Sequence, residues 1–146
     1  MNWKDNLLTT DEAIRDLLSA TKTIAVLGIK PESHSGQPAF YVPKYMADAG
    51  YDIIPVPVYY PEVTEILGRA VHRDLNDIEG NVDMVNVFRR SEDIPKHTQE
   101  ILAKKPTAVW FQLGIRNDEI AEQLAAAGIK VVQDRCLLVE HRATRR

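Results

Sequence analysis

Groups that can bind phosphate follow the first strongly apolar segment of the sequence, residues 22–29. Near its end stands Gly28, whose missing side chain permits a tight turn and a close approach of the backbone to a ligand. Just beyond it, Lys30 supplies a positive charge, and the hydroxyl of Ser33 together with exposed backbone amides can donate hydrogen bonds to phosphate oxygens. The same composition is typical of a flexible surface loop, so phosphate binding and a purely structural loop are both open interpretations.

A pair of adjacent arginines, Arg89 and Arg90, follows another apolar segment at residues 82–88. Planar guanidinium groups can hold phosphates through paired hydrogen bonds. Alternatively, these side chains form ion pairs with Glu92 or Asp93 at the start of the next helix. Both interpretations are open for each arginine taken singly.

Two further strand ends carry groups suited to a nucleotide ligand. The segment PVPVYY at 55–60 offers prolines and aromatic rings that could form a wall against an adenine ring, although Pro55 is also explained as a rigid exit from a strand. The run 107–113 contains Gln112, a polar residue in an otherwise apolar segment, and Gly114 after it permits a close approach. We therefore expect Gln112 to face a pocket at the edge of a sheet.

The motifs of the common nucleotide-binding enzymes are missing from this sequence. The dinucleotide fingerprint needs G-x-G-x-x-G and then an acidic residue near the end of the second strand. Here Ile29 follows Gly28, the next glycine is Gly36, and residues 55–60 contain no acid. There is likewise no G-x-x-x-x-G-K-[ST] loop. Ordinary recognition of NAD or of a nucleoside triphosphate is therefore disfavoured.

The sequence offers little for catalysis or metal binding. Its 4 histidines are scattered, without metal-ligand spacing or a nucleophile motif. The single cysteine, Cys136, cannot form an internal disulfide or a multi-thiolate metal site, which indicates a reducing, cytoplasmic environment. We predict no metal site and no catalytic residue. If the protein is an enzyme, only His34 and Cys136 are candidates for a catalytic role.

The segments that must position these groups alternate between strand and helix. Short continuous apolar runs indicate strands covered on both faces, and therefore a parallel sheet. Capped segments with helical apolar spacing between them indicate crossover helices. The predicted fold class is α/β, a three-layer α/β/α arrangement with a mostly parallel sheet of about five or six strands and a ligand site beyond the C-terminal strand ends. The predicted strands are 22–29, 51–58, 82–88, 107–113 and 129–135, with a brief one at 70–72; the predicted helices are 9–19, 41–50, 92–104 and 117–128, with a short helix or turn at 63–68 and a frayed tail at 142–146.

Length and charge narrow the possible functions. The 146 residues suit a single domain, which we expect to span 1–146 with its core at about 20–141. The net charge of −3 argues against nucleic acid or an anionic membrane as the main partner. No apolar run reaches the ~18 residues that a membrane span needs, and the N-terminus lacks the apolar core of a signal peptide.

Several of these segments, taken together, resemble a family of small CoA-binding proteins related to the N-terminal domain of the succinyl-CoA synthetase α-subunit. The resemblance covers about residues 20–141 and includes IAVLGIKPE, VDMVNVFRRSEDIP, VWFQLGI and AAAGIKVVQDRCLLVEH. The combination of FRR, W-x-Q-L-G and D-R-C is its specific part. The sequence departs from the family's usual PVNP, where it has PVPV at 55–58, and this leaves the details of the adenosine wall open.

This resemblance implies a Rossmann-like fold that binds coenzyme A across the strand ends. It places one group of residues near each part of the ligand, by position in the motifs. Arg89 is added as a phosphate ligand on chemical grounds alone. The implied binding residues are Gly28, Lys30 and Ser33 at the pyrophosphate, Val56 and Pro57 at the adenosine, and Val87, Phe88 and Gln112 along the pantetheine arm, with Ile29 as a further binding residue.

Three kinds of function follow from the sequence. The favoured one is a non-catalytic protein that binds CoA or acyl-CoA, with no nucleic-acid or membrane partner and an unknown protein partner. The second is an enzyme, either an NAD(P)-linked oxidoreductase or the CoA-binding subunit of a split acyl-CoA synthetase. The synthetase reaction needs a phosphorylated histidine in a further domain, so we do not expect ligation by this chain alone. The third is a structural or interaction protein with a vestigial pocket.

Overall fold

The computed structural model describes residues 2–144, and its centre is a five-stranded sheet of strand order β2-β1-β5-β6-β7. Every pairing in this sheet is parallel. The predicted α/β class with a mostly parallel sheet is therefore confirmed. The strands are β1 (Thr23–Leu27), β2 (Asp52–Val56), β5 (Met84–Val87), β6 (Ala108–Phe111) and β7 (Lys130–Val132).

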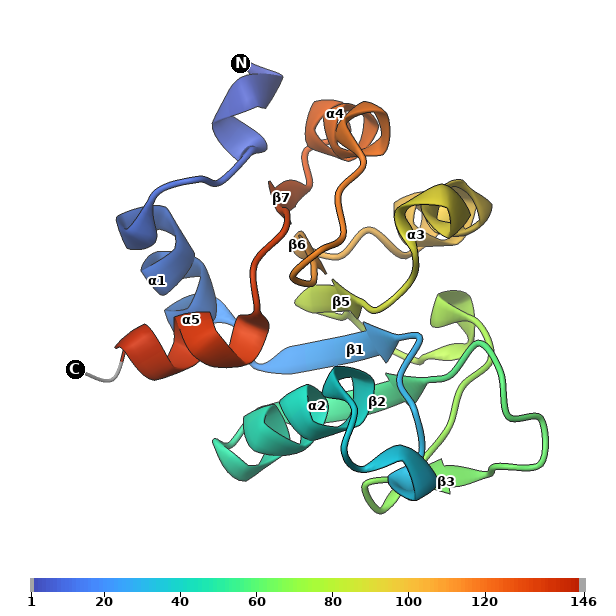
Figure 1. The fold of residues 1–146 in the computed structure, drawn as a ribbon. Helices are drawn as coiled ribbons and strands as arrows, with labels where there is room; N and C mark the ends of the chain where they lie inside the picture. Colours follow the sequence, from blue (N-terminus) through green and yellow to red (C-terminus); the bar gives the residue numbers. More distant parts are fainter. Residues whose placement is uncertain (1, 145–146) are drawn as a thin grey trace.

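Helices cover both faces of the sheet (Figure 1). On one face lie α1 (Asp11–Ala20), α2 (Pro38–Asp48) and α5 (Leu137–Thr144), and on the other lie α3 (Thr98–Lys104) and α4 (Asp118–Ala126). Short 3-10 helices are found between or before several of these elements. They are η1 (Trp3–Asn6), η2 (Glu32–His34), η3 (Leu75–Asp77) and η4 (Ser91–His97).

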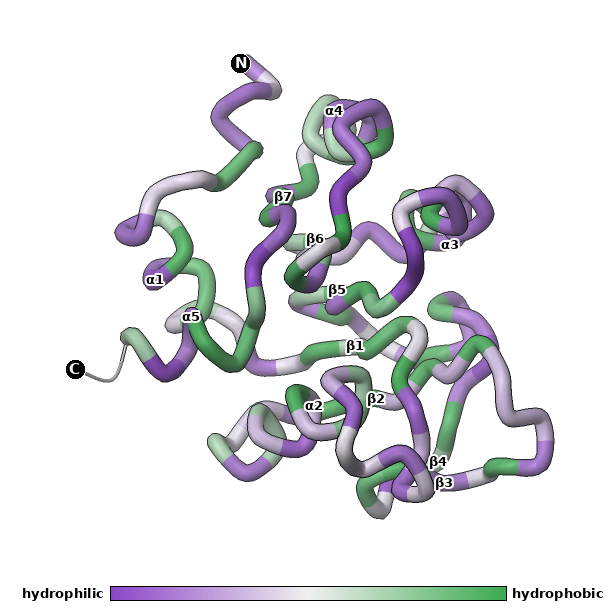
Figure 2. The backbone as a smooth tube through the Cα atoms, in the orientation of Figure 1, coloured by the Kyte–Doolittle hydropathy of each residue, from purple (hydrophilic) through white to green (hydrophobic). Residues whose placement is uncertain are grey.

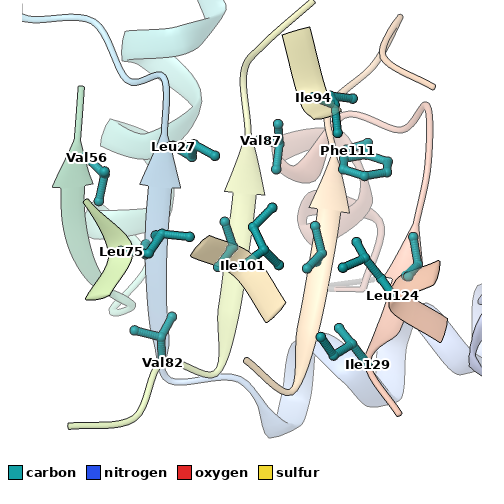
Figure 3. Packing of buried hydrophobic residues seen from close by; sticks show 14 of the residues in the cluster. Leu27, Val56, Leu75, Val82, Val87, Ile94, Ile101, Phe111, Leu124 and Ile129 are labelled. Atoms are coloured by element: carbon teal, nitrogen blue, oxygen red, sulfur yellow. The ribbon is translucent and has the colours of Figure 1, made fainter. Parts of the chain in front are cut away.

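Each face of the sheet has its own hydrophobic core, because successive side chains of a strand point to opposite faces. Hydrophobic residues accordingly concentrate along the central strands in Figure 2. Figure 3 shows the core on the α3/α4 face, and a second core fills the α1/α2/α5 face. The first core contains Leu27, Val56, Val87, Phe111, Ile101 and Leu124, and the second contains Ile14, Val26, Met46, Met84 and Trp110.

Side-chain caps begin two of the helices where the sequence predicts them. The Thr10 hydroxyl accepts a hydrogen bond from the Ala13 amide at 3.2 Å, and the Asn117 side chain accepts one from the Ile120 amide at 3.0 Å. The helix predicted at 41–50 begins earlier, at Pro38. Proline suits the first helical position because its φ is already helical and that position needs no N–H donor.

The segment after β2 differs from its prediction. Of the helix or turn predicted at 63–68, the structure has a turn: β3 (Glu65–Ile66) and β4 (Arg69–Ala70) pair as a two-stranded antiparallel ribbon outside the main sheet, and β4 overlaps the strand predicted at 70–72 only at Ala70. The turn between them uses Leu67 and Gly68, both with positive φ. Ile66 is fully buried in the core of the α1/α2/α5 face, so tertiary packing holds this short ribbon in place.

Two other predictions need correction. The helix predicted at 92–104 is divided into η4 and α3, and Pro95 lies inside η4, where it cannot donate an α-helical hydrogen bond. The tail predicted to fray is helical in α5 as far as Thr144, while residues 145–146 lie outside the described part of the chain. A hydrogen-bond contact of 2.9 Å between the Tyr45 hydroxyl and His141 Nδ1 ties α5 to α2.

The topology creates a crevice between β1 and β5. The chain leaves β1 through α2 on one face and leaves β5 through α3 on the other face, so the order of the strands reverses between these two neighbours. Their C-terminal ends are in contact, because the Phe88 amide donates to the Leu27 carbonyl at 2.8 Å. Open parallel sheets bind their ligands at this switch point. Within residues 2–144, no helix has the length and apolar character to span a membrane.

Candidate functional site

A cavity of about 590 Å³ opens over the C-terminal ends of β1, β5 and β6. Its volume is typical of small-molecule sites, which span roughly 300–1,000 Å³. The loop after β1 contributes Lys30, the loop after β5 contributes Phe88 and Arg89, and the loop after β6 contributes Gln112 and Leu113. The cavity therefore lies at the position that the topology favours for a ligand.

Four of the ten predicted binding residues line this cavity. They are Lys30, Phe88, Arg89 and Gln112. The other six are placed differently: Gly28 forms the turn after β1, Ser33 is exposed in η2, and the side chains of Ile29, Val56, Pro57 and Val87 are buried. In Figure 3, Val56 and Val87 point into the core of the α3/α4 face.

Position 28 must be glycine because its backbone packs directly against the backbone of the loop after β5. Its φ is +90°, and a Cβ atom placed on it would lie 2.4 Å from the carbonyl oxygen of Phe88. Its amide donates to the Val56 carbonyl at 2.9 Å. The close approach that the sequence indicates is therefore an approach to the β5 loop, and it brings Lys30 and Arg89 to the same cavity.

A relay of polar side chains orients Arg89. Its Nε donates to His97 Nε2 at 3.2 Å, and His97 Nδ1 lies 2.6 Å from Glu100 Oε1. Because arginine can only donate, His97 Nε2 must accept, and the ring proton on Nδ1 faces Glu100. The other Glu100 oxygen accepts from the Leu75 amide at 3.0 Å. This relay, which the sequence analysis missed, was signalled only by the i,i+3 spacing of a histidine and a glutamate.

Arg89 Nη2 lies 3.8 Å from Asp93 Oδ2, so the ion pair that the sequence left open forms for both arginines, most closely for Arg90. Arg90 Nε donates to Asp93 Oδ2 at 2.9 Å, while Lys96 Nζ donates to Asp93 Oδ1 at 3.1 Å. These hydrogen bonds, from Lys96 first and then from Arg90, hold the pKa of Asp93 below its ordinary value. The same contact with Asp93 raises the pKa of Arg90. Asp93 is thus charged at neutral pH and anchors the turn that follows Arg89.

The beginning of α2 forms another side of the cavity. Gln37, Pro38 and Ala39 line it, and the Lys30 ammonium donates to the Gln37 side-chain oxygen. Gln37 makes no side-chain capping bond to the helix. Pro38 has no N–H, and the Phe40 and Tyr41 amides donate to the Gln37 carbonyl, so the Ala39 amide and the positive end of the helix dipole are what suit this end of the cavity to phosphate. These three residues were not predicted as site residues, because the helix was expected to begin at residue 41.

Arg90, Ser91 and Glu92 add a polar stretch to the cavity lining, and one wall is apolar. Phe88, Leu113 and Ile115 line it, and the Leu113 side chain is 65% exposed at the cavity mouth. The Gly114 amide donates to the Asp134 carboxylate at 2.7 Å, which fastens this loop to the end of β7. A ligand with both an anionic and an apolar part therefore matches the two sides of the cavity.

An aromatic loop follows β2. Its Tyr59 side chain is 72% exposed, and the Tyr60 ring lies 5.1 Å from the ring of His34 in the loop after β1. The Arg73 guanidinium donates to the carbonyls of Tyr59, Tyr60 and Val63 at 2.7–3.0 Å. The Arg73 side chain thus bridges three carbonyls of this loop.

The two residues considered for catalysis lie outside the cavity lining. His34 contacts Ser33 and Tyr60, and Cys136 is half-buried just before α5. Within residues 2–144, no group of three or more histidine, cysteine or acidic side chains could hold a metal ion. A second hollow of about 460 Å³ lies between residues 7–9 and α4, and its Arg116 is paired with Asp118.

Comparison with known proteins identifies the family of this chain. Residues 22–142 match the family described as CoA binding domain. This chain belongs to that family. The CoA-binding domain has 38% identity over 132 residues to the uncharacterized protein YneT of Bacillus subtilis (strain 168), covering 90% of this chain and 94% of YneT.

Solved structures share the fold of this CoA-binding domain. Cell-free ID.343 from Thermus thermophilus superposes with a TM-score of 0.85 at 40% identity, covering 93% of this chain and 99% of that one. A hypothetical protein from Pyrococcus horikoshii OT3 superposes with a TM-score of 0.84 at 31% identity, covering 94% of each chain. The likeness extends over nearly the full length of each relative.

Proposed function

We propose that this protein binds coenzyme A, free or acylated, in the cavity at the switch point of the sheet, and that its role is binding and not catalysis. The observation that carries the proposal is the cavity's two-sided lining. Lys30, Arg89, Arg90 and the start of α2 form a cationic side, on which Glu92 is paired with Arg90 at 3.3 Å, and Phe88, Leu113 and Ile115 form an apolar side. Coenzyme A joins a charged phosphate portion to an uncharged arm, so one ligand matches both sides.

The phosphate portion is assigned to the cationic side. Arg89 is held toward the cavity by His97, and its guanidinium can form paired hydrogen bonds to phosphate oxygens. Lys30 adds a point charge, and the start of α2 adds the Ala39 amide and the positive end of the helix dipole. Ser33 keeps its predicted role near the pyrophosphate as a part of the proposal, since its side chain is exposed in the same loop.

The two ends of the ligand are assigned to neighbouring loops. We assign the adenosine to the loop after β2, where Tyr59 offers an exposed ring for stacking. Val56 and Pro57 are buried at the base of that loop, so contact with the adenosine falls to the residues that follow them. The arm runs along Phe88 to Gln112, both in the cavity wall.

The remaining predictions fit the proposed role. His34 and Cys136 lie outside the cavity lining, which favours binding over catalysis. A single domain over residues 1–146 with its core at about 20–141, and the cytoplasmic location, stay predictions. A protein partner is unknown.

Calorimetric titration of nucleotide-stripped protein tests the proposal. CoA, acetyl-CoA and NADPH are titrated in parallel, and micromolar binding of CoA with no comparable binding of NADPH is expected. Binding of NADPH in place of CoA would support the oxidoreductase alternative and overturn the proposal. Binding of neither nucleotide would overturn it in favour of an interaction protein.

A charge-matched pair of variants locates the site. Arg89→Met removes a guanidinium of the cavity, whereas Lys44→Met removes one positive charge from the outer surface of α2, where Lys44 pairs with Asp48 at 2.9 Å. A hydrogen bond to a charged group contributes about 1.5–3 kcal/mol, so Arg89→Met should weaken CoA binding roughly ten- to hundredfold. Lys44→Met should leave it unchanged. Equal effects of the two substitutions would show a non-specific charge effect.

A further inference from the structure

Two buried amide side chains lie beneath the cavity on neighbouring strands. Asn86, in β5, is fully buried, and Gln112, directly after β6, is 4% exposed. Their side chains are in contact: Asn86 Nδ2 lies 3.4 Å from Gln112 Oε1. Gln112 lines the cavity and Asn86 does not. In a sheet whose other buried strand side chains are apolar, two touching amides need a physical explanation.

Backbone groups decide which way both amides point. The Leu137 amide, at the start of α5, donates to Gln112 Oε1 at 3.3 Å, and the Trp110 carbonyl accepts from Asn86 Nδ2 at 3.4 Å. A backbone N–H can only donate and a backbone carbonyl can only accept, so neither amide can be turned over without losing its partners. Gln112 Oε1 therefore receives two donors from inside the protein.

With both amides in this orientation, the Gln112 NH₂ group and the Asn86 side-chain oxygen have no hydrogen-bond partner within the described part of the protein. Gln112 Nε2 makes no hydrogen bond within residues 2–144, and it is not fully enclosed by protein. Its N–H groups are therefore accessible from the cavity that Gln112 lines. Asn86 Oδ1 is enclosed and unpaired. A buried acceptor without a partner lowers stability, and folds retain such a group where it serves another purpose.

We propose that Asn86 is a positioning residue, which holds Gln112 so that the Gln112 amide N–H donates to a carbonyl oxygen of the ligand. This inference rests on the proposed binding of coenzyme A, whose arm carries amide carbonyls and, when acylated, a thioester carbonyl. The Gln112 amide thus hydrogen-bonds to a carbonyl oxygen of the ligand. A part of the ligand without carbonyl groups should bind independently of Asn86 and Gln112.

The substitution Asn86→Leu separates positioning from structure. It removes the hydrogen bond to Gln112 and also removes the unpaired oxygen, with a side chain of nearly the same size. The expected result is an unchanged or higher Tm together with CoA binding that is weaker by roughly two- to tenfold, the effect of one neutral hydrogen bond. A structural asparagine gives the opposite result, a lower Tm with unchanged CoA binding, and that result would overturn the inference.

Ligand fragments provide the second measurement. Pantetheine, which carries the amides, and adenosine 3′,5′-bisphosphate, which has no carbonyl-bearing arm, are titrated into the wild type and into Asn86→Leu. Pantetheine binding should weaken as CoA binding does, while binding of the bisphosphate should stay the same. Equal weakening of both fragments would overturn the inference, because the change would then be a general distortion of the site.

Gln112→Glu is the companion variant, which tests the inference if Asn86→Leu does not fold. A carboxylate can accept from the same two internal donors but presents an oxygen acceptor to the cavity in place of N–H. CoA and pantetheine binding should fall by at least the same factor as in Asn86→Leu, with the bisphosphate less affected. If the wild type binds no CoA, the proposed function fails. If the wild type binds CoA and Gln112→Glu binds it equally well, only the proposed hydrogen bond from Gln112 to a ligand carbonyl is refuted.

Discussion

The substitution Gly28→Ala tests the backbone contact that closes the base of the cavity. The new Cβ would lie 2.4 Å from the Phe88 carbonyl oxygen, 3.0 Å from its carbon and 3.2 Å from Arg89 Cδ. Two of these three atoms belong to the backbone of the β5 loop, so relief of the clash requires the loop to move. The φ of +90° adds conformational strain for any residue with a side chain.

Gly128→Ala supplies a matched control. Gly128 has almost the same φ, +89°, but a Cβ there would meet no atom within 4 Å. The positive φ alone costs about 1–2 kcal/mol, and overpacking adds about 1–3 kcal/mol at Gly28. Gly28→Ala should therefore lower the free energy of unfolding by about 2–5 kcal/mol, and Gly128→Ala by only about 1–2 kcal/mol.

Urea denaturation of both variants, followed by circular dichroism, measures the two losses. At roughly 3–4 °C per kcal/mol for a chain of this length, thermal melts should show the same ranking. Equal losses in the two variants would refute the reasoning, because only conformational strain would then be at work. A folded Gly28→Ala protein should also bind CoA more weakly, since the shifted loop carries Arg89.

Two further substitutions test the ion pairs and the aromatic loop. Because hydrogen bonds from Lys96 and Arg90 lower the pKa of Asp93, its contribution to stability is present above the unfolded value of about 3.9 and is lost as the pH falls through the lower folded value. The Tm difference between the wild type and Asp93→Asn should thus be seen near neutral pH and shrink below about pH 4; a difference constant with pH would contradict this. Arg73→Met, which removes the donors to the carbonyls of 59–63, should cost about 1–3 kcal/mol and speed proteolysis of that loop, and Arg73→Lys should not restore it, because an ammonium cannot reach the same acceptors. Unchanged proteolysis in Arg73→Met would show that the loop is held by other contacts.

Local interactions explain the parts of the fold that were predicted from the sequence. The caps at Thr10 and Asn117 act over three residues, so they can be recognised without knowing what packs nearby. The five apolar runs correspond to the five parallel strands, because strands covered on both faces must be apolar at successive positions. These features depend on near neighbours in the chain, and the sequence contains them all.

The elements that were missed depend on distant contacts. The ribbon at 65–70 buries Ile66 in a core built mainly by α1 and α2, and its own residues indicated only a brief strand at 70–72, without the partner strand Glu65–Ile66. Helix α5 is tied to the fold by the contact between Tyr45 and His141, which are 96 residues apart. Short elements cannot be stable alone, so their presence is decided by what covers them.

The candidate site divides in the same way. The chemical types at Lys30, Arg89 and Gln112 predict a ligand site at the strand ends, and that prediction needs only the sequence. Only the tertiary structure decided that Phe88 lines the cavity while Val87, its neighbour, lies in the core of the α3/α4 face. Successive residues along a strand point to opposite faces, so these two side chains face different ways. The tertiary structure also decided the direction of the Gln112 amide, which depends on a donor 25 residues further along the chain. Residue type is local information, whereas the direction of a hydrogen bond exists only once the chain has folded.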